Sequence, residues 1–329
     1  MNQKKAAFVA VVGRPSVGKS TLINRICGEK VAIVSAAPQT TRNAIRGIVN
    51  REQGQLVFID TPGRHNSEKK FNKKLMEVSD RAVNEADLTL YVLDASRPPG
   101  TEERAIAELL RPLAERTVAA VNKIDMLKKG DLRDAACSGI RKFLEEQLSG
   151  LSGDRCFAIS AKNNEGVDAL LAALYAMAPE GEPFYGGDYY TDQEVDFRVA
   201  EIIREQAINR LRQELPHSLY VEVADTEFLP EKDGARRLWV RAFIIVERES
   251  QKGMVVGKGG EMIKAIRQAA QKDLDRIFDW KTALDLRVKT GKDWRHNDST
   301  LRRIIETAPR HNFSKEALIY SIENKSVLL

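Results

Sequence analysis

The stretch Gly13-Arg14-Pro15-Ser16-Val17-Gly18-Lys19-Ser20 decides the fold of this chain, because it has the spacing G-x-x-x-x-G-K-[ST] of a phosphate-binding loop. Its glycines let the backbone curl until several N–H groups point at one anion, and a helix that starts there adds its positive N-terminal end. The apolar residues 7–12 are typical of a buried parallel strand, and residues 21–27 predict a helix that ends at Gly28. This order of strand, loop and helix favours a P-loop over its alternative, a glycine-rich turn in another α/β protein.

The composition describes a chain with a substantial core. It has 329 residues, enough for two domains, of which 43% are hydrophobic and 6% aromatic. Cys27, Cys137 and Cys156 lie far apart, and the four histidines are not spaced to complete a zinc site, so we expect reduced cysteines and a cytoplasmic location. No apolar run approaches the roughly 18 residues of a membrane-spanning helix, so any membrane contact is expected to be peripheral.

Two further segments are expected to surround the phosphates. Residues 35–42 form a small, polar, proline-containing loop, in which Thr41 could bind magnesium; an ordinary polar loop is the alternative. Residues 55–59 predict a buried strand that runs into Asp60-Thr61-Pro62-Gly63. Because ligands bind at the carboxyl ends of parallel strands, Asp60 is expected to be the acidic partner of magnesium, and the N–H of Gly63 a contact of the γ-phosphate.

Base selection is predicted at the ends of two more strands. Residues 88–93 and 117–121 read as buried strands, and the second runs into Asn122-Lys123-Ile124-Asp125. The carboxylate of Asp125 can accept two hydrogen bonds from guanine, whereas adenine has no such donor pair, and an unpaired polar site discriminates by about 10⁴-fold or more. Residues 157–159 lead into Ser160-Ala161-Lys162, whose backbone can meet the guanine oxygen.

The predicted site therefore takes GTP, GDP and Mg²⁺. We expect the residues that contact the nucleotide to be Gly13, Ser16, Val17, Gly18, Lys19, Ser20, Thr21, Asp60, Gly63, Asn122, Lys123, Asp125, Ser160, Ala161 and Lys162. The expected magnesium ligands are Ser20, Thr41 and Asp60, and the expected catalytic residues are Lys19, Thr41 and Gly63. A P-loop kinase is disfavoured by Asn122 and Asp125.

A proline- and glycine-rich segment, residues 179–193, is expected to link two domains. After it we predict a helix at 194–215, strands at 219–224 and 238–246, and an alternating strand at 284–288. Residues 257–260 form a G-x-x-G loop between an apolar run and a helix. Such a loop clamps the backbone of about four nucleotides in a KH domain, and a mere glycine turn is the alternative.

The local clustering of basic residues supports RNA binding by the second half of the chain, whereas its total charge does not. The net charge is +5, yet residues 181–329 hold 25 basic and 25 acidic side chains, whereas residues 252–295 hold eleven basic and six acidic ones. The residues expected to contact RNA are Lys252, Gly253, Met254, Gly257, Lys258, Gly259, Gly260 and Lys264.

Together these motifs resemble the Era family of GTPases over residues 6–295, with a TRAFAC-class G domain followed by a bacterial-type KH domain. The resemblance implies an α/β P-loop NTPase domain with a mostly parallel sheet flanked by helices, then a smaller α+β type II KH domain. It divides the chain into a G domain at 1–178, the linker at 179–193, a KH domain at 194–295 and a helical extension at 296–329. It further implies a cytoplasmic monomer that hydrolyses GTP, binds the 3′ end of small-subunit ribosomal RNA during small-subunit maturation, and contacts the membrane peripherally.

The chain departs from the family pattern in three places. Ser16 replaces an asparagine that is linked to potassium-dependent activation, so potassium dependence is left open. Arg64 stands where the family usually has an apolar residue; it is interpreted either as a stabiliser of transition-state charge or as a solvated loop residue that could meet RNA. The extension, with helical stretches predicted at 299–306 and 314–322, has no guide in the family. These departures leave room for an alternative, a GTP-gated binding protein whose second domain and extension engage a protein or membrane partner.

Overall fold

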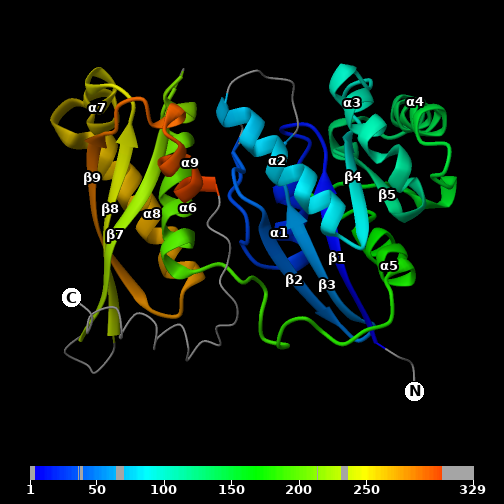
Figure 1. The fold of residues 1–329 in the computed structure, drawn as a ribbon, viewed down its shortest axis with the longest axis horizontal. Helices are drawn as coiled ribbons and strands as arrows, with labels where there is room; N and C mark the ends of the chain where they lie inside the picture. Colours follow the sequence, from blue (N-terminus) through cyan, green and yellow to red (C-terminus); the bar gives the residue numbers. More distant parts are fainter. Residues whose placement is uncertain are drawn as a thin grey trace. The chain divides into compact units, whose positions relative to one another are not determined.

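The structure, a computed structural model, describes residues 4–35, 37, 40–63, 70–212, 214–230 and 236–305. Its contacts divide the chain into two units. The first unit comprises Met1–Val34 and Thr41–Thr191, and the second comprises Ser35–Thr40 and Asp192–Leu329. Each unit contains its own β-sheet (Figure 1).

The first unit is built on a six-stranded sheet with the order β2-β3-β1-β4-β5-β6. The strands are β1 Lys5–Val12, β2 Ile45–Arg51, β3 Gly54–Asp60, β4 Leu88–Asp94, β5 Thr117–Asn122 and β6 Cys156–Ala158. All neighbours pair in parallel except β2, which is antiparallel to β3. The predicted strands at 7–12, 55–59, 88–93, 117–121 and 157–159 are thereby confirmed, with ends that differ by one or two residues.

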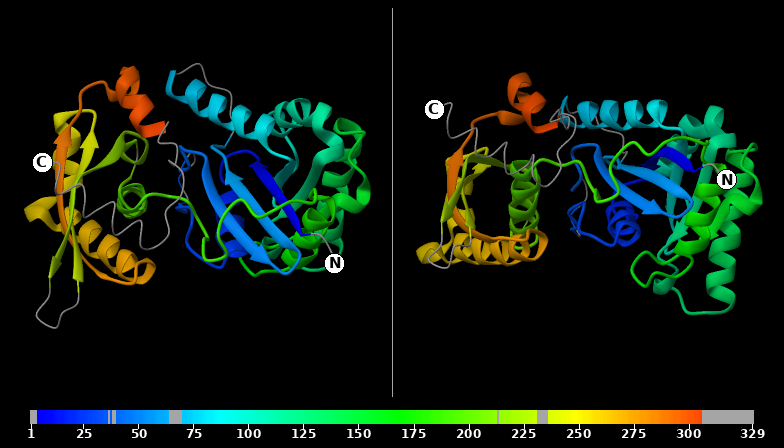
Figure 2. Two further views of the ribbon diagram at one scale, coloured as in Figure 1. Left: turned by 60° about the horizontal axis from the view of Figure 1, so that its bottom comes forward. Right: turned by 90° about the horizontal axis from the view of Figure 1, so that it is seen from below.

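Helices cover both faces of this sheet, which explains why its central strands are apolar on both sides. They are α1 Lys19–Cys27, α2 Lys70–Glu85, α3 Thr101–Leu110, α4 Asp131–Gln147 and α5 Val167–Met177. The side chains of α2, α3 and α4 pack in one core with alternate residues of the strands, such as Tyr91 and Leu93 of β4. Helix α1 lies on the opposite face from α2 (Figure 2).

The edge strand β2 was not predicted from the sequence. Its N–H groups and carbonyls also bind the segment that follows α5: Ile48 N donates to Tyr190 O at 2.9 Å, and Thr191 Oγ1 donates to Arg46 O at 2.8 Å. The proline- and glycine-rich residues up to Thr191 therefore run along the first unit.

The second unit is a three-stranded sheet with the order β7-β8-β9. Its elements are α6 Val195–Ile208, β7 Leu219–Pro230, β8 Arg236–Val246, α7 Glu249–Val256, α8 Glu261–Ile277, β9 Lys281–Thr290 and α9 Asp298–Ile305. Strand β8 pairs antiparallel with β7 and parallel with β9. Alternate residues of β8, among them Val240 and Ile244, form a core with α6 and α8, so both helices cover one face of the sheet. This is the predicted KH order.

Several predicted bounds are wrong. The helix expected at 194–215 ends at Ile208, and Leu215 enters the core from a short 3₁₀ turn instead, whose first positions accept Pro216 because no N–H is needed there. The strand expected at 219–224 continues to Pro230, with a bulge after Val223. The stretch predicted at 299–306 corresponds to α9, and the one at 314–322 lies outside the described residues.

Candidate functional site

The P-loop connects β1 to α1 and needs both of its glycines. Gly13 has φ +156°, and a Cβ there would lie 2.5 Å from the carbonyl oxygen of Val92. Gly18 has φ +99°, and a Cβ there would lie 2.5 Å from Nδ2 of Asn122. Ser16 also has a left-handed backbone, with φ +61°. The loop is thus curled as the sequence predicts.

Lys19 turns its side chain back across this loop. Its Nζ donates hydrogen bonds to the carbonyl oxygens of Gly13, at 2.9 Å, and Arg14, at 3.0 Å. The side chain is buried, and burial lowers its pKa to about 8; Asp60 opposes this shift and Arg14 adds to it. A phosphate bound in the loop would stabilise the charged form of the ammonium and raise this pKa.

The three predicted magnesium ligands converge. Oδ2 of Asp60, at the carboxyl end of β3, accepts hydrogen bonds from Ser20 Oγ at 2.6 Å and Thr41 Oγ1 at 3.3 Å. The two hydroxyl oxygens lie 3.2 Å apart. Burial raises the pKa of Asp60, against the opposing effects of Lys19 and of the two hydrogen bonds.

The donor set of this cluster fits Mg²⁺. Oδ1 of Asp60 is buried and has no hydrogen-bond partner within the part of the chain that the structure describes. Mg²⁺ prefers hard oxygen ligands, typically one or two carboxylates together with waters and substrate phosphates. A cation would therefore satisfy the unpaired oxygen and keep the carboxylate charged.

Gly63 lies against the P-loop. A Cβ on Gly63 would be 2.7 Å from the backbone nitrogen of Pro15, so only glycine permits this approach. Gly63 is therefore close to the predicted phosphate position. Arg64 lies outside the described residues, and both of its interpretations stay predictions.

The base-selecting motifs are joined to the P-loop through Asn122. Its Nδ2 donates to Val17 O at 2.8 Å, and its Oδ1 accepts from Ala161 N at 3.0 Å. Ser160 Oγ donates to Oδ1 of Asp125 at 2.6 Å. The structure thus brings together motifs that are more than a hundred residues apart along the chain.

Arg25 of α1 binds backbone carbonyls of the last of these motifs, Ser160-Ala161-Lys162. Its Nε donates to Ala161 O at 3.2 Å and its Nη2 to Lys162 O at 2.8 Å. Thr21, one helical turn earlier, is half-buried at the start of the same helix. Arg25 was not among the residues predicted for the site, and no motif indicates its role.

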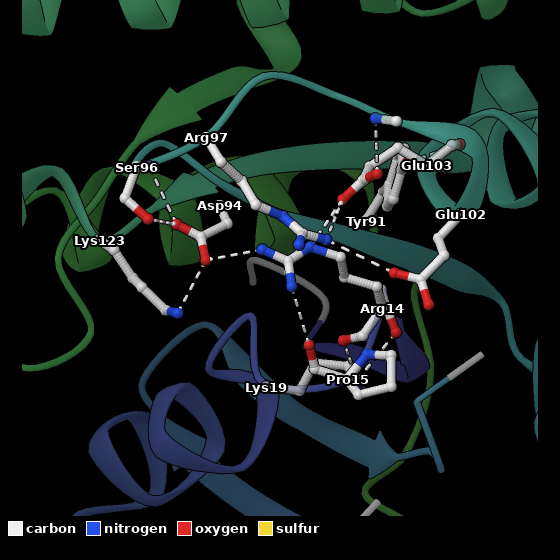
Figure 3. A network of polar contacts seen from close by, with 12 residues as sticks. Arg14, Pro15, Lys19, Tyr91, Asp94, Ser96, Arg97, Glu102, Glu103 and Lys123 are labelled. Carbon is white, nitrogen blue, oxygen red and sulfur yellow. Dashed lines mark hydrogen bonds and ion pairs between the residues drawn. The ribbon is translucent and has the colours of Figure 1, made fainter. Parts of the chain in front are cut away.

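A second set of missed residues surrounds the P-loop (Figure 3). The buried carboxylate of Asp94, at the carboxyl end of β4, contacts Arg14 and Lys123. Glu103 of α3 contacts Arg14 from the other side. The position of Asp94 was the available signal, since it ends a parallel strand as Asp60 does.

In the second unit, the G-x-x-G loop lies between α7 and α8. Gly257, Gly259 and Gly260 have φ of +74°, +59° and +81°. A Cβ on Gly257 would be 2.7 Å from Cβ of Met262, whereas Gly259 and Gly260 face open space. The backbone at the tip of the loop is therefore accessible for close approach by a ligand.

The other residues predicted to contact RNA flank this loop. Lys252, Gly253 and Met254 lie on α7, and the Met254 side chain is 54% exposed. Lys252 is paired with Glu249 at 3.2 Å. Lys258 in the loop and Lys264 on α8 are both exposed.

A row of cations continues from the loop along α8. Arg267, Lys272 and Arg276, together with Lys281 of β9, line an open groove of about 580 Å³ that contains one acidic side chain, Asp275. Among the described residues these four side chains make no ion pair or hydrogen bond, whereas Arg241 and Arg287 both pair with Asp285. This helix face thus carries positive charge that the fold does not neutralise.

Comparisons with known proteins agree with this arrangement. Residues 8–123 match the family described as 50S ribosome-binding GTPase, and residues 214–295 match the KH domain. GTPase Era of Treponema denticola is 50% identical over 299 residues, which cover 91% of this chain and 99% of that protein. GTPase Era of Borreliella burgdorferi is 43% identical over 301 residues, covering 92% and 99%.

Two solved structures have the same architecture. A crystal structure of Era in complex with MgGDPNP and nucleotides 1506–1542 of 16S ribosomal RNA has a TM-score of 0.84 and 31% identity, covering 92% of this chain and 98% of that chain. An Aquifex aeolicus Era variant bound to GDP·AlF4⁻ has a TM-score of 0.84 and 32% identity, covering 91% and 98%. Across the described residues, no helix is long and apolar enough to cross a membrane.

Proposed function

The chain belongs to the GTPase Era family, and from this premise we propose that its GTPase cycle controls the binding of the 3′ end of small-subunit ribosomal RNA. As a member of this family it hydrolyses GTP to GDP and phosphate, with Mg²⁺ as cofactor, and carries a KH domain for RNA. The choice of RNA is our proposal; it is supported by the related Era complex with nucleotides 1506–1542 of 16S ribosomal RNA.

We assign the chemistry to the residues of the first unit. Lys19 contacts the β- and γ-phosphates, and Mg²⁺, which Ser20, Thr41 and Asp60 hold, neutralises charge on the transferred phosphoryl group. A water attacks the γ-phosphate in line, near the backbone of Gly63. No general base is assigned, because no titratable side chain of these motifs is left without another role.

Base selection belongs to the second group of motifs. Asp125 accepts hydrogen bonds from the guanine edge while Ser160 orients its carboxylate at 2.6 Å. Asn122 keeps this group at a fixed distance from the P-loop through Val17. Loss of the γ-phosphate then removes the contacts that Thr41 and Gly63 make with it, and we propose that this change reaches the RNA-binding unit.

The observation that carries the RNA part of the proposal is the open G-x-x-G loop with its uncompensated cations. The exposed glycines let an RNA backbone approach closely, and Lys258 and Lys264 lie beside it. A polyanion would supply the negative charge that this surface lacks.

The experiment that tests the proposal is single-turnover GTP hydrolysis with a short RNA that copies the 3′ end of the small-subunit ribosomal RNA. We expect this RNA to change the rate, and an unrelated RNA of the same length to leave it unchanged. Changing both Lys258 and Gly259 to aspartate should remove the RNA effect and preserve hydrolysis without RNA. If the matching and unrelated RNAs act alike while GTP is still cleaved, the GTPase assignment stands and the second domain serves a protein or membrane partner.

Location and assembly complete the proposal and rest on the family resemblance alone. We propose that the chain acts as a monomer in the cytoplasm, binds the small ribosomal subunit during its maturation, and touches the inner face of the membrane only peripherally. Light scattering of the purified protein tests the first point. Sedimentation with anionic vesicles, with and without GTP, tests the last.

A further inference from the structure

Asp94 makes a second connection between the base-selecting motif and the P-loop, besides the one through Asn122. Its Oδ2 lies 2.8 Å from Nζ of Lys123, in the base-selecting motif, and 2.9 Å from Nη2 of Arg14, in the P-loop. Its Oδ1 accepts hydrogen bonds from the backbone N–H and the hydroxyl of Ser96, at 3.0 and 2.6 Å. Every oxygen of this carboxylate is thus engaged (Figure 3).

Arg14 is held on its other side by Glu103. The distance from Nε of Arg14 to Oε1 of Glu103 is 2.7 Å, and Oε2 of Glu103 accepts from the N–H of Gly100 at 2.8 Å. Arg14 and Glu103 are 8% and 4% exposed. The guanidinium is therefore fixed between two carboxylates and is not available to reach a phosphate.

Lys123 differs from the other members of this group because it borders the site. Its side chain is 28% exposed, against 4% for Asp94, and its backbone has φ +68°. A left-handed conformation is unfavourable for lysine and persists only where the surroundings enforce it. The ion pair to the buried carboxylate restrains the side chain of this same residue.

The surroundings of Asp94 show that its ion pair with Lys123 is not an ordinary surface pair exposed to water. Burial raises the pKa of Asp94, but the hydrogen bonds from Lys123 and Ser96 more than offset it, so the pKa lies below its usual range. A buried carboxylate that loses its cation is left uncompensated, which is strongly unfavourable. Lys123 is therefore restrained by a partner that cannot itself move into solvent.

We propose that Asp94 is a positioning residue for nucleotide binding, which holds Lys123 at the base-selecting motif and joins that motif to the P-loop through Arg14. This inference rests on the nucleotide site proposed above. Because neither contact involves the γ-phosphate position, Asp94 supports the binding of GDP and of GTP equally. It would not contribute to the distinction between the two nucleotides.

The test is a double-mutant cycle on nucleotide affinity in the full chain. Asp94→Asn removes the charge at nearly constant volume, and Lys123→Met removes the ammonium and keeps the aliphatic stem. We expect each single change to raise the Kd for a fluorescent GDP analogue about tenfold, equivalent to about 1.4 kcal/mol. Since each change breaks the same ion pair, adding Asp94→Asn to Lys123→Met should raise the Kd by less than about threefold.

The cycle separates a positioning role from a structural one. A merely structural aspartate would weaken binding by the same factor with and without the Lys123 ammonium, and such multiplicative effects would overturn the inference. So would an Asp94→Asn variant whose Kd stays within twofold of the unmodified chain. Asp154→Asn, an exposed aspartate of the same unit, is the matched control and should leave the Kd unchanged.

A second measurement separates this inference from the proposed function. Asp94→Asn should raise the Kd for GDP and for a non-hydrolysable GTP analogue by the same factor. A selective loss of GTP binding would contradict the proposed role of Asp94 alone. Failure of the unmodified chain to bind GDP would instead contradict the nucleotide site itself.

Discussion

At the scale of single residues, burial sets the chemistry of the phosphate-binding site. Lys19 and Asp60 are almost completely buried, and each has a pKa shifted toward its neutral form by loss of solvent. Such charged groups are costly to bury without partners. A phosphate for Lys19 and a cation for Asp60 would satisfy both groups, so ligand binding and charging of these groups are linked.

This linkage predicts a pH dependence of GDP binding. The pKa of Lys19 is about 8 without ligand, and a bound phosphate raises it. The affinity for GDP is therefore highest well below pH 8, where Lys19 is already charged, and it falls as the pH rises above 8. The Kd for GDP should increase about tenfold between pH 7 and pH 9. Calorimetry in buffers of different ionisation enthalpy should show proton uptake that grows over the same range. In Lys19→Arg, whose guanidinium stays protonated, the dependence should disappear; a constant Kd in the unmodified chain would contradict the prediction.

At the scale of secondary-structure elements, α1 illustrates how two glycines at the ends of one helix differ. Gly18 and Gly28 both have a left-handed backbone, with φ of +99° and +72°. A Cβ added at Gly28 would meet nothing within 4 Å, whereas one added at Gly18 would collide with Asn122. Gly18 is therefore needed for the nucleotide site, whereas Gly28 only allows the helix to end.

Gly18→Ala is expected to weaken nucleotide binding, and Gly28→Ala is its matched control. Both replacements place alanine in a left-handed conformation, which costs about 1–2 kcal/mol of stability. Only Gly18→Ala displaces the Asn122 side chain and breaks its bond to the P-loop, so the Kd for GDP should rise at least about tenfold. Thermal unfolding measures the loss of stability that both variants share, and GDP titration measures the loss of affinity expected for Gly18→Ala alone. Equal Kd values for the two variants would argue against the geometry described for Asn122.

The second unit shows another contrast, between cations of β8 and β9 that the fold neutralises and cations of α8 that it does not. Arg241 and Arg287 share Asp285, but Lys272 and Arg276 have no partner among the described residues. Unpaired cations on one helix face repel one another and are stabilised by phosphates. The RNA therefore is expected to continue from the G-x-x-G loop onto this face.

Replacing Lys272 and Arg276 together by alanine should weaken RNA binding and its dependence on salt. The slope of log K against log salt should fall by about 1 to 2, because two phosphate contacts are lost. Filter binding at several salt concentrations measures both quantities. The control replaces Arg81 and Arg104, exposed cations of the first unit, by alanine and makes the same change in net charge. An identical slope in both variants would place the RNA elsewhere.

At the scale of the whole molecule, two units with separate cores carry two separate binding sites. A GTPase cycle that controls RNA binding requires a coupling free energy between them. Thermodynamic linkage makes this coupling reciprocal: the factor by which GTP changes RNA affinity equals the factor by which RNA changes GTP affinity.

This reciprocity is testable with six equilibrium constants. RNA affinity is measured with GDP and with a non-hydrolysable GTP analogue, and the affinity for each nucleotide is measured with and without RNA. The two ratios should agree, with a value of about 5 to 150. In the variant with aspartate at both Lys258 and Gly259, RNA should no longer affect nucleotide affinity. Ratios of 1 in the unmodified chain would show that the two sites act independently.

Local residue patterns were sufficient to predict each motif whose function depends on consecutive residues. The P-loop, the segment Asp60 to Gly63, the base-selecting motifs and the G-x-x-G loop each need only a strand or helix end and a few adjacent side chains, so their spacing along the chain is enough to predict them. The strands around them were predictable because a parallel sheet buries apolar runs on both faces.

The distant residues that complete these sites became known only from the folded chain. Asp94, Arg14 and Glu103 meet because the connections of a parallel sheet bring their ends to one edge, and no local pattern records that meeting. The same holds for the edge strand β2, which is polar at one end and pairs with residues after α5, and for α6, which ends before Leu215. Local spacing can be read directly from the sequence. Contacts between residues far apart in the chain depend on tertiary packing, because their free energies contribute only once the chain has folded.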